Sequence, residues 1–190
     1  MNYSVIVLSV KTDVERRKHI TKVCKTLKLN FNFFNALTPV DLDDSLINTY
    51  YSNMDVYQYP ELNHKAVFAT FESHKEILKT IYTSKQNTLV LEDDLVPIRD
   101  YNFTDIDFSS FDLLQLMSEI SCCCHFVNWI SAGFLYQKFN SKDYYPTQAF
   151  DWELHKLRNE FNIQTVNEPV FEQTNNFKSH LAPYGYKKIH

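Results

Sequence analysis

Three consecutive acids, Glu92, Asp93 and Asp94, directly follow the apolar run of residues 88–91. That run predicts a short, fully buried strand. In an open α/β sheet, ligands bind beyond the carboxyl ends of the strands, so acids placed there can hold a metal ion and the phosphates that it carries. If the chain stays extended, Glu92 and Asp94 share one face and one metal, while Asp93 faces the other way. The alternative is a solvated strand end, or the cap of a following helix.

A nucleotide would have to be held without a glycine-rich phosphate loop, because the chain has only two glycines, Gly133 and Gly185. A metal bridge to the diphosphate, together with cationic side chains, is the obvious substitute. Arg16 and Arg17 are the cationic candidates, since they lie in the first turn of a predicted helix, next to the end of the first strand. The alternative for both is a solvated helix surface.

The elements that would position these residues follow from hydrophobic periodicity. The first half of the chain predicts strands over residues 3–10, 31–37 and 88–91, with helices after Asp13 and over residues 66–82. This alternation is typical of a parallel α/β sheet. Residues 38–62 form a polar excursion with at most a short helix over residues 43–51.

The second half predicts strands with short connections, which are typical of mixed or antiparallel additions to a sheet. These strands are expected over residues 111–117, 122–127 and 129–137. A helix is expected over residues 150–161, with Asp151 and Glu153 in its first turn.

Composition narrows the class of protein. A chain of 190 residues, 44% of them hydrophobic, predicts one compact domain that buries roughly 70% of its unfolded surface. The net charge of −4 and the lack of a long basic tract argue against a nucleic-acid binder. No stretch approaches the ~20 apolar residues of a membrane span, and the N-terminus lacks a signal-peptide layout, so we expect a cytoplasmic protein. The four cysteines predict small buried residues rather than disulfides or a zinc site.

Several short segments follow one another along the chain in a characteristic order. They are Thr12-Asp13, Arg16-Arg17, Phe33-Phe34-Asn35-Ala36, Ser73-His74, residues 89–94, Ser131-Ala132-Gly133-Phe134, Phe150-Asp151, and residues 169–173 with Ser179. Their order and spacing resemble glycosyltransferase family 25, the lipooligosaccharide sugar transferases. The resemblance covers nearly the whole chain and is most specific at the acid-tipped strand and at the Ser-His pair on a helix.

The resemblance implies an α/β, GT-A-like fold with a mixed central sheet in a single domain over residues 1–190. Residues 1–100 would form a Rossmann-type nucleotide-sugar half, and residues 101–190 the acceptor half and tail. The implied reaction moves a hexose, often galactose, from a UDP-sugar to a glycan or other hydroxyl acceptor with inversion. Peripheral contact with a membrane stays open.

The resemblance also implies a centre for Mn²⁺ or Mg²⁺, which would neutralise the charge growing on the nucleoside diphosphate as it leaves. Asp94 would ligate the metal, Glu92 would contact the ribose or the water shell of the metal, and the late histidine His180 would complete the coordination. The expected nucleotide site comprises Arg16, Arg17, Glu92, Asp93 and His74. For His74 the alternative is a packed helix histidine that hydrogen-bonds a neighbouring strand.

A general base must take the proton of the acceptor hydroxyl. We assign this role to Asp151, with Glu153 in reserve. The alternative for Asp151 is a helix N-cap, which needs no catalytic role.

One departure from the family pattern bears on activity. Where the family has Gly-Glu-x-Gly-Cys ahead of Ser-His, this chain has Ala66-Val67-Phe68-Ala69-Thr70, so Val67 replaces a glutamate. That change favours an inactive GT-A-like module that binds a sugar nucleotide or a partner enzyme. A metal-dependent phosphodiesterase or nuclease is the other alternative, and it would need further acids and histidines for a second ion.

Overall fold

The computed structural model describes residues 2–53, 63–117, 121, 123–144, 146 and 149–177. In chain order the elements are β1 (Ser4–Ser9), α1 (Val14–Thr26), β2 (Asn32–Asn35), η1 (Pro39–Asp41), α2 (Asp44–Asn53), α3 (His64–Ser84), β3 (Thr88–Glu92), β4 (Leu95–Pro97), β5 (Leu113–Gln115), β6 (Cys124–Val127), α4 (Trp129–Phe139), α5 (Phe150–Lys156), η2 (Leu157–Asn159), β7 (Ile163–Thr165) and β8 (Phe171–Gln173).

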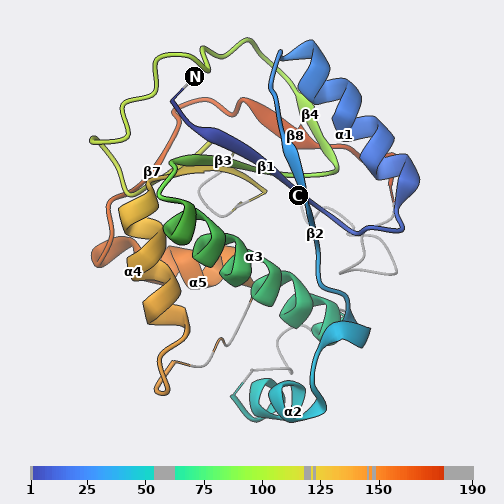
Figure 1. Ribbon diagram of the computed structural model, residues 1–190, viewed down its shortest axis with the longest axis vertical. Helices are drawn as coiled ribbons and strands as arrows, with labels where there is room; N and C mark the ends of the chain where they lie inside the picture. Colours follow the sequence, from blue (N-terminus) through green and yellow to red (C-terminus); the bar gives the residue numbers. More distant parts are fainter. Residues whose placement is uncertain are drawn as a thin grey trace.

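A six-stranded sheet with the order β2-β1-β3-β6-β5-β7 forms the centre (Figure 1). β1 runs parallel to both β2 and β3, whereas β6 is antiparallel to β3 and to β5. β4 and β8 form a separate antiparallel ribbon. The expected α/β class with a mixed sheet is therefore confirmed, and the carboxyl ends of β1, β2 and β3 meet at one edge.

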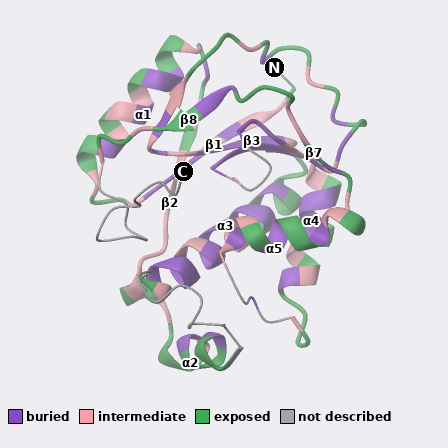
Figure 2. Cartoon of the chain, turned by 180° about the vertical axis from the view of Figure 1, so that it is seen from behind, coloured by how far each residue is buried: buried purple, intermediate pink, exposed green. Residues whose placement is uncertain are grey.

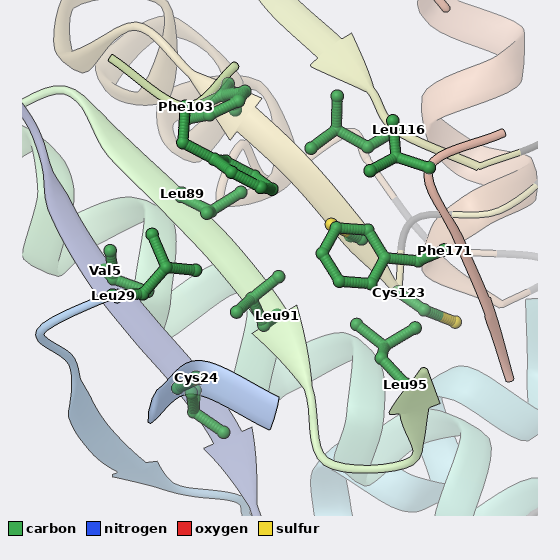
Figure 3. Close-up of a cluster of buried hydrophobic side chains, with 14 of the residues drawn as sticks. Val5, Cys24, Leu29, Leu89, Leu91, Leu95, Phe103, Leu116, Cys123 and Phe171 are labelled. Carbon is green, nitrogen blue, oxygen red and sulfur yellow. The ribbon is translucent and has the colours of Figure 1, made fainter. Parts of the chain in front are cut away.

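Alternate residues of β3 enter two cores on opposite faces of the sheet. Leu89 and Leu91 pack with residues of α1 and β8, as Figure 3 shows, whereas Val90 packs with residues of α3, α4 and α5. The first four residues of β3 are buried, which is why this strand forms a continuous apolar run. Figure 2 shows buried β3 between helices whose outer faces are exposed.

Side-chain caps start the helices that border the sheet edge. Asp13 accepts a hydrogen bond from the backbone N–H of Arg16 at the start of α1, as predicted. Asn63 accepts one from the backbone N–H of Ala66 at the start of α3. Each bond satisfies a backbone donor that has no partner within its helix.

The predicted strand over residues 129–137 is wrong, because this segment is helix α4. Its aromatic residues and Ile130 favoured a strand. Asn128, however, accepts a hydrogen bond from the N–H of Ile130 and caps a helix, and the buried residues of that helix recur at helical spacing: Ser131, Ala132, Leu135 and Phe139. Gly133 lies on the same face, where an added Cβ would come within 2.4 Å of the Tyr82 ring of α3.

Other predictions differ at the element ends. The helix expected over residues 150–161 ends as α5 at Lys156 and continues as the 3-10 turn η2. The short helix expected over residues 43–51 is α2. Cys24, Cys123 and Cys124 are buried and free, as predicted, while Cys122 lies outside the described residues. None of the described helices is long and apolar enough to cross a membrane.

Candidate active site

A cavity of about 270 Å³ opens at the carboxyl ends of β1, β2 and β3, where an open α/β sheet binds its ligands. One part of its wall is mostly apolar and comes from the end of β1, the segment after β2 and the first turns of α3. The other part is charged and consists of Arg16, Glu92, Asp93 and Asp94, with Gln173 of β8 beside them.

The three acids do not continue the strand. β3 ends at Glu92, and the chain turns at Asp93 and Asp94 before β4 begins. The expectation that Asp93 faces away from Asp94 is therefore wrong, because Nη1 of Arg16 donates to Oδ1 of Asp93 at 2.9 Å and to Oδ2 of Asp94 at 3.2 Å. We call residues 92–94 the acid turn.

Arg16 is the buried cation of the acid turn. Its side chain is only 7% exposed, and its Nε lies 3.4 Å from Oδ2 of Asp13. Burial acts to lower its pKa, but the hydrogen bond to Asp93 and the nearby carboxylate charges outweigh burial and raise that pKa. Arg16 therefore stays charged and holds the acid turn in place from the cavity wall.

Arg17 has a different place. Its Nη2 donates to the backbone oxygen of Ser9 at 3.1 Å and to Oδ1 of Asn35 at 2.6 Å, and its guanidinium lies 4.4 Å from the ring centroid of Phe33. It is not among the residues that line the cavity. Arg17 thus ties the ends of β1 and β2 together behind the cavity.

Burial, with a smaller contribution from neighbouring negative charge, raises the pKa of both Glu92 and Asp94. Burial raises the pKa of Glu92 to about 7; the charge of Asp93 adds to this, and Cys123 and Arg16 oppose it. Burial raises the pKa of Asp94 to about 6; the charge of Glu92 adds to this, and Arg16 opposes it. A cation bound beside these two carboxylates would favour their charged forms.

The acid turn fits a hard divalent cation, because carboxylate oxygens are the ligands that Mg²⁺ and Mn²⁺ prefer. Glu92 and Asp94 both line the cavity and would hold the ion. Among the described residues, no three His, Cys, Asp or Glu side chains form a complete ligand set. His180, the predicted third ligand, lies outside the described residues.

His74 reaches the acid turn from behind. It is 1% exposed and does not line the cavity, and its Nε2 lies 3.2 Å from Oε1 of Glu92. Its ring stacks on Phe150 at a centroid distance of 4.4 Å and an angle of 7°. Burial lowers its pKa to about 4 against the charge of Asp151, so the ring is neutral at pH 7 and the contact is a hydrogen bond. This is the geometry of a packed helix histidine that bonds a neighbouring strand.

The first turn of α5 places Asp151 and Glu153 differently. Ala149 occupies the N-cap position, and no side chain caps the helix, so Asp151 is not its N-cap. Asp151 is half-buried, and its charge acts on the pKa of His74 and of Cys123. Glu153 is 2% exposed and accepts hydrogen bonds from the Tyr144 hydroxyl and from Nζ of Lys156. Of the two acids, Asp151 is therefore the one whose charge acts on His74 and Cys123, the neighbours of Glu92.

Two residues without a predicted role contact this site. Nε2 of Gln173 lies 3.5 Å from Oδ1 of Asp94, and the next backbone N–H, that of Thr174, donates to the Asp94 backbone oxygen at 2.7 Å. Ser73 accepts a hydrogen bond from the backbone N–H of Leu37 at 2.9 Å. Both Ser73 and Gln173 lie in segments that match the family pattern, and this match is the sequence feature that could have pointed to a role for them.

The chain combines a mixed α/β sheet with an acid-lined cavity at the carboxyl ends of its parallel strands, and comparison with known proteins defines the family. The model of "Glycosyltransferase family 25 (LPS biosynthesis protein)" matches residues 2–186. The chain therefore belongs to glycosyltransferase family 25 and is a glycosyltransferase. A comparison with curated proteins finds no match.

Two solved structures are similar at low identity. One is a glycosyltransferase involved in the glycosylation of the major capsid of PBCV-1, with 12% identity over 86% of this chain and 81% of that chain, at a TM-score of 0.43. The other is a mutant of Drosophila β1,4-galactosyltransferase 7 in complex with manganese, UDP-Gal and xylobiose, with 11% identity over 93% of this chain and 72% of that chain, at a TM-score of 0.46.

Proposed function

We propose that this glycosyltransferase moves a hexose, with galactose as the first candidate, from a UDP-sugar to a hydroxyl group of a glycan, with inversion and with Mn²⁺ or Mg²⁺. The observation that carries the proposal is the cavity at the carboxyl ends of β1, β2 and β3, with Glu92 and Asp94 on its wall. Residues 1–100 would supply the donor half, and residues 101–190 the acceptor half.

The two parts of the cavity wall suit the two parts of a nucleoside diphosphate. The mostly apolar part, which includes Leu8, Ala36 and Ala69, accepts the nucleoside. The acid turn would face the diphosphate, and Glu92 and Asp94 would hold a divalent ion there. When bound, such an ion would supply positive charge that stabilises the leaving diphosphate. Arg16 lines this part of the wall and Arg17 does not, which favours Arg16 as the arginine nearer to the phosphates.

Asp151 is the proposed general base, with Glu153 in reserve. The base must take the proton of the acceptor hydroxyl on the face of the sugar opposite to the leaving group. Asp151 belongs to the acceptor half, and it is linked to the acid turn through its neighbour Phe150, whose ring stacks on His74. The contacts of Glu153 with Tyr144 and Lys156 favour Asp151 over Glu153.

The position of Val67 bears on the inactive alternative. Val67 is 1% exposed and packs with Tyr50 and Phe68, whereas its neighbours Ala66 and Ala69 line the cavity. The position of the lost glutamate thus lies on the side of α3 that faces α2, away from the acid turn, whereas Ala66, Ala69 and Thr70, which replace the glycines and the cysteine of the family pattern, line the cavity. The loss of the glutamate leaves the acid turn untouched, which supports an active donor site.

A thermal-shift screen tests the proposal. UDP-, GDP-, CMP- and dTDP-sugars are compared with and without Mn²⁺, and release of the nucleotide product is measured with a glycan acceptor. We expect UDP-galactose to raise the melting temperature more with Mn²⁺ than without it, and UDP to be released. Stabilisation by another nucleotide class, or stabilisation that ignores Mn²⁺, would overturn the proposed donor site. Stabilisation without release would identify a binding module.

A further inference from the structure

Ser73 and His74 are adjacent on α3, and each contacts a different rim of the cavity. Both are buried, at 0% and 1% exposure, and neither lines the cavity. Because successive residues of a helix point roughly 100° apart, the two side chains leave α3 in different directions. One reaches the segment after β2, and the other reaches the end of β3.

The Ser73 hydroxyl holds the rim formed by residues 36–39. It accepts the Leu37 N–H at 2.9 Å and donates its own hydrogen to the Ala69 backbone oxygen at 2.7 Å. The donated bond fixes the direction in which the oxygen can accept. This segment of the chain is otherwise held at its ends, where the Ala36 N–H donates to the Ser9 backbone oxygen and the Thr38 N–H donates to Asp41.

The His74 imidazole holds the opposite rim. Its contact with Glu92 fixes one of the two carboxylates that face the cavity, and its stack on Phe150 fixes the ring plane from α5. The strands served by the two side chains, β2 and β3, lie on opposite sides of β1. Two neighbouring residues therefore span the edge at which three parallel strands end.

We propose that Ser73 and His74 are positioning residues that fix separate parts of the donor site. Ser73 sets the rim where the nucleoside binds, and His74 sets the Glu92 carboxylate where the metal and the diphosphate bind. This inference rests on the proposed function of the cavity. It assigns two separable effects to two adjacent residues, which a merely structural role would not produce.

Ser73→Ala and His74→Phe are the test variants, and Leu78→Ala is the matched control. His74→Phe keeps an aromatic ring against Phe150 but removes the N–H donor. Leu78 lies on the same helix, is 1% exposed and packs in the core away from the cavity. The control therefore loses stability without losing a contact to either rim.

Two measurements separate the effects. Amide hydrogen exchange in the ligand-free protein reports on the Leu37 N–H, and calorimetry measures UDP without metal and Mn²⁺ in the presence of UDP. Ser73→Ala loses one hydrogen bond, so we expect the Leu37 N–H to exchange about 2–10-fold faster and UDP without metal to bind about 2–10-fold more weakly. The affinity of this variant for Mn²⁺ should be kept. Loss of a residue that orients a metal ligand predicts about 10–100-fold weaker Mn²⁺ binding for His74→Phe, with metal-free UDP affinity kept.

The conservative variants should restore each function. Ser73→Thr keeps the hydroxyl, and His74→Gln keeps an N–H donor for Glu92, so both should behave more like the wild type than the test variants do. If a test variant fails to fold, the conservative variant at the same position is measured in its place. It should bind UDP and Mn²⁺ as the wild type does.

Equal effects of both test variants on both ligands, or effects no larger than those of Leu78→Ala, would overturn the inference. A wild-type protein that binds neither UDP nor Mn²⁺ would instead overturn the proposed function. In that case the Leu37 exchange rate still decides whether Ser73 holds the rim, because it needs no ligand.

Discussion

The acid turn and the first turn of α5 both contain carboxylates, but the surroundings of these carboxylates differ. In the acid turn, Glu92 and Asp94 face a cavity, and buried Arg16 pairs with Asp94 and acts by its charge on Glu92. In α5, Glu153 is enclosed by the Tyr144 hydroxyl and by Lys156, whose side chain is 46% exposed. The environment of a carboxylate, rather than its residue type, therefore separates a candidate metal ligand from a packing residue.

The largest expected effect is a loss of transfer rate when Asp151 of α5 is substituted. Asp151→Asn removes a carboxylate that can take a proton, so we expect the transfer rate to fall by about 10²–10⁴-fold. Because Ala149 is the N-cap, the melting temperature and the donor affinity should change little. Rate, donor affinity and melting temperature are measured on the same preparation. A near-normal rate would move the base to Glu153 or to another acid.

Arg16→Gln should be the most destabilising change at the acid turn. It leaves buried Asp93 and Asp94 without their cation, and breaking a buried pair costs about 3–5 kcal/mol of unfolding free energy. Lys156→Gln is the matched change at α5, and because Lys156 is half exposed and the Tyr144 hydroxyl still bonds buried Glu153, it should cost less, about 1–3 kcal/mol. Urea unfolding of both variants measures the difference. Similar losses in both would show that the two turns do not differ as described.

Asp94→Ala tests the metal site directly. It removes a proposed ligand, so Mn²⁺ affinity in the presence of UDP should fall by at least the ~10–100-fold that loss of an outer-shell partner costs. Asp93→Asn is the comparison within the same turn, and it should retain more of the affinity. Calorimetric titration of Mn²⁺ into each variant in the presence of UDP measures these affinities. A wild-type Mn²⁺ affinity in Asp94→Ala would show that the acid turn is not the metal site.

Glu153→Gln should act on stability alone. The buried carboxylate loses charge-assisted contacts with Tyr144 and Lys156, which predicts a loss of about 1.5–3 kcal/mol in urea unfolding. The transfer rate of the folded variant should match the wild type. A rate that falls by orders of magnitude at unchanged stability would instead make Glu153 the base.

A pH dependence of opposite sign is expected for folding and for metal binding. Burial raises the pKa of Glu92 from 4.5 to about 7 and that of Asp94 from 3.8 to about 6, so the folded chain binds more protons than the unfolded chain in this range. Their contribution to stability is therefore lost as the pH rises through roughly 4–7, while Mn²⁺ affinity increases because its ligands must be deprotonated.

The control for this pH dependence is the double variant Glu92→Gln with Asp94→Asn. Burial lowers the pKa of His74 to about 4, which acts on stability in the opposite direction in both proteins. The difference in melting temperature between wild type and double variant, measured without metal at pH 5 and at pH 7.5, isolates the two acids. A constant difference would contradict the assigned shifts.

Local patterns predicted the parts of the site that depend on neighbours in the chain. A continuous apolar run predicted β3, and the Asp13 cap fixed the start of α1 and thus the place of Arg16. The turn after Glu92 was missed because a strand pattern does not say where the strand ends. α4 was missed because its aromatic residues favour strands, while its cap and its buried face decide for a helix.

Contacts between distant residues could not be predicted in the same way. Ser73 meets a residue 36 positions away, and Gln173 meets one 79 positions away. No periodicity encodes such a pair, because it exists only once the sheet order has brought β2, β3 and β8 around one cavity. The family pattern marked these segments without giving their roles.

The closure of the acid turn by β8 has a consequence for the order of synthesis. The Asp94 backbone oxygen is bonded by Thr174, and β4, which follows the acid turn, pairs with β8. A ribosome makes β1, α1, β2, α3 and β3 long before it makes β8. During that interval a nascent chain can assemble the parallel strands but not the ribbon that completes the cavity wall. The wall of the cavity is therefore complete only when residues 171–174 have left the ribosome.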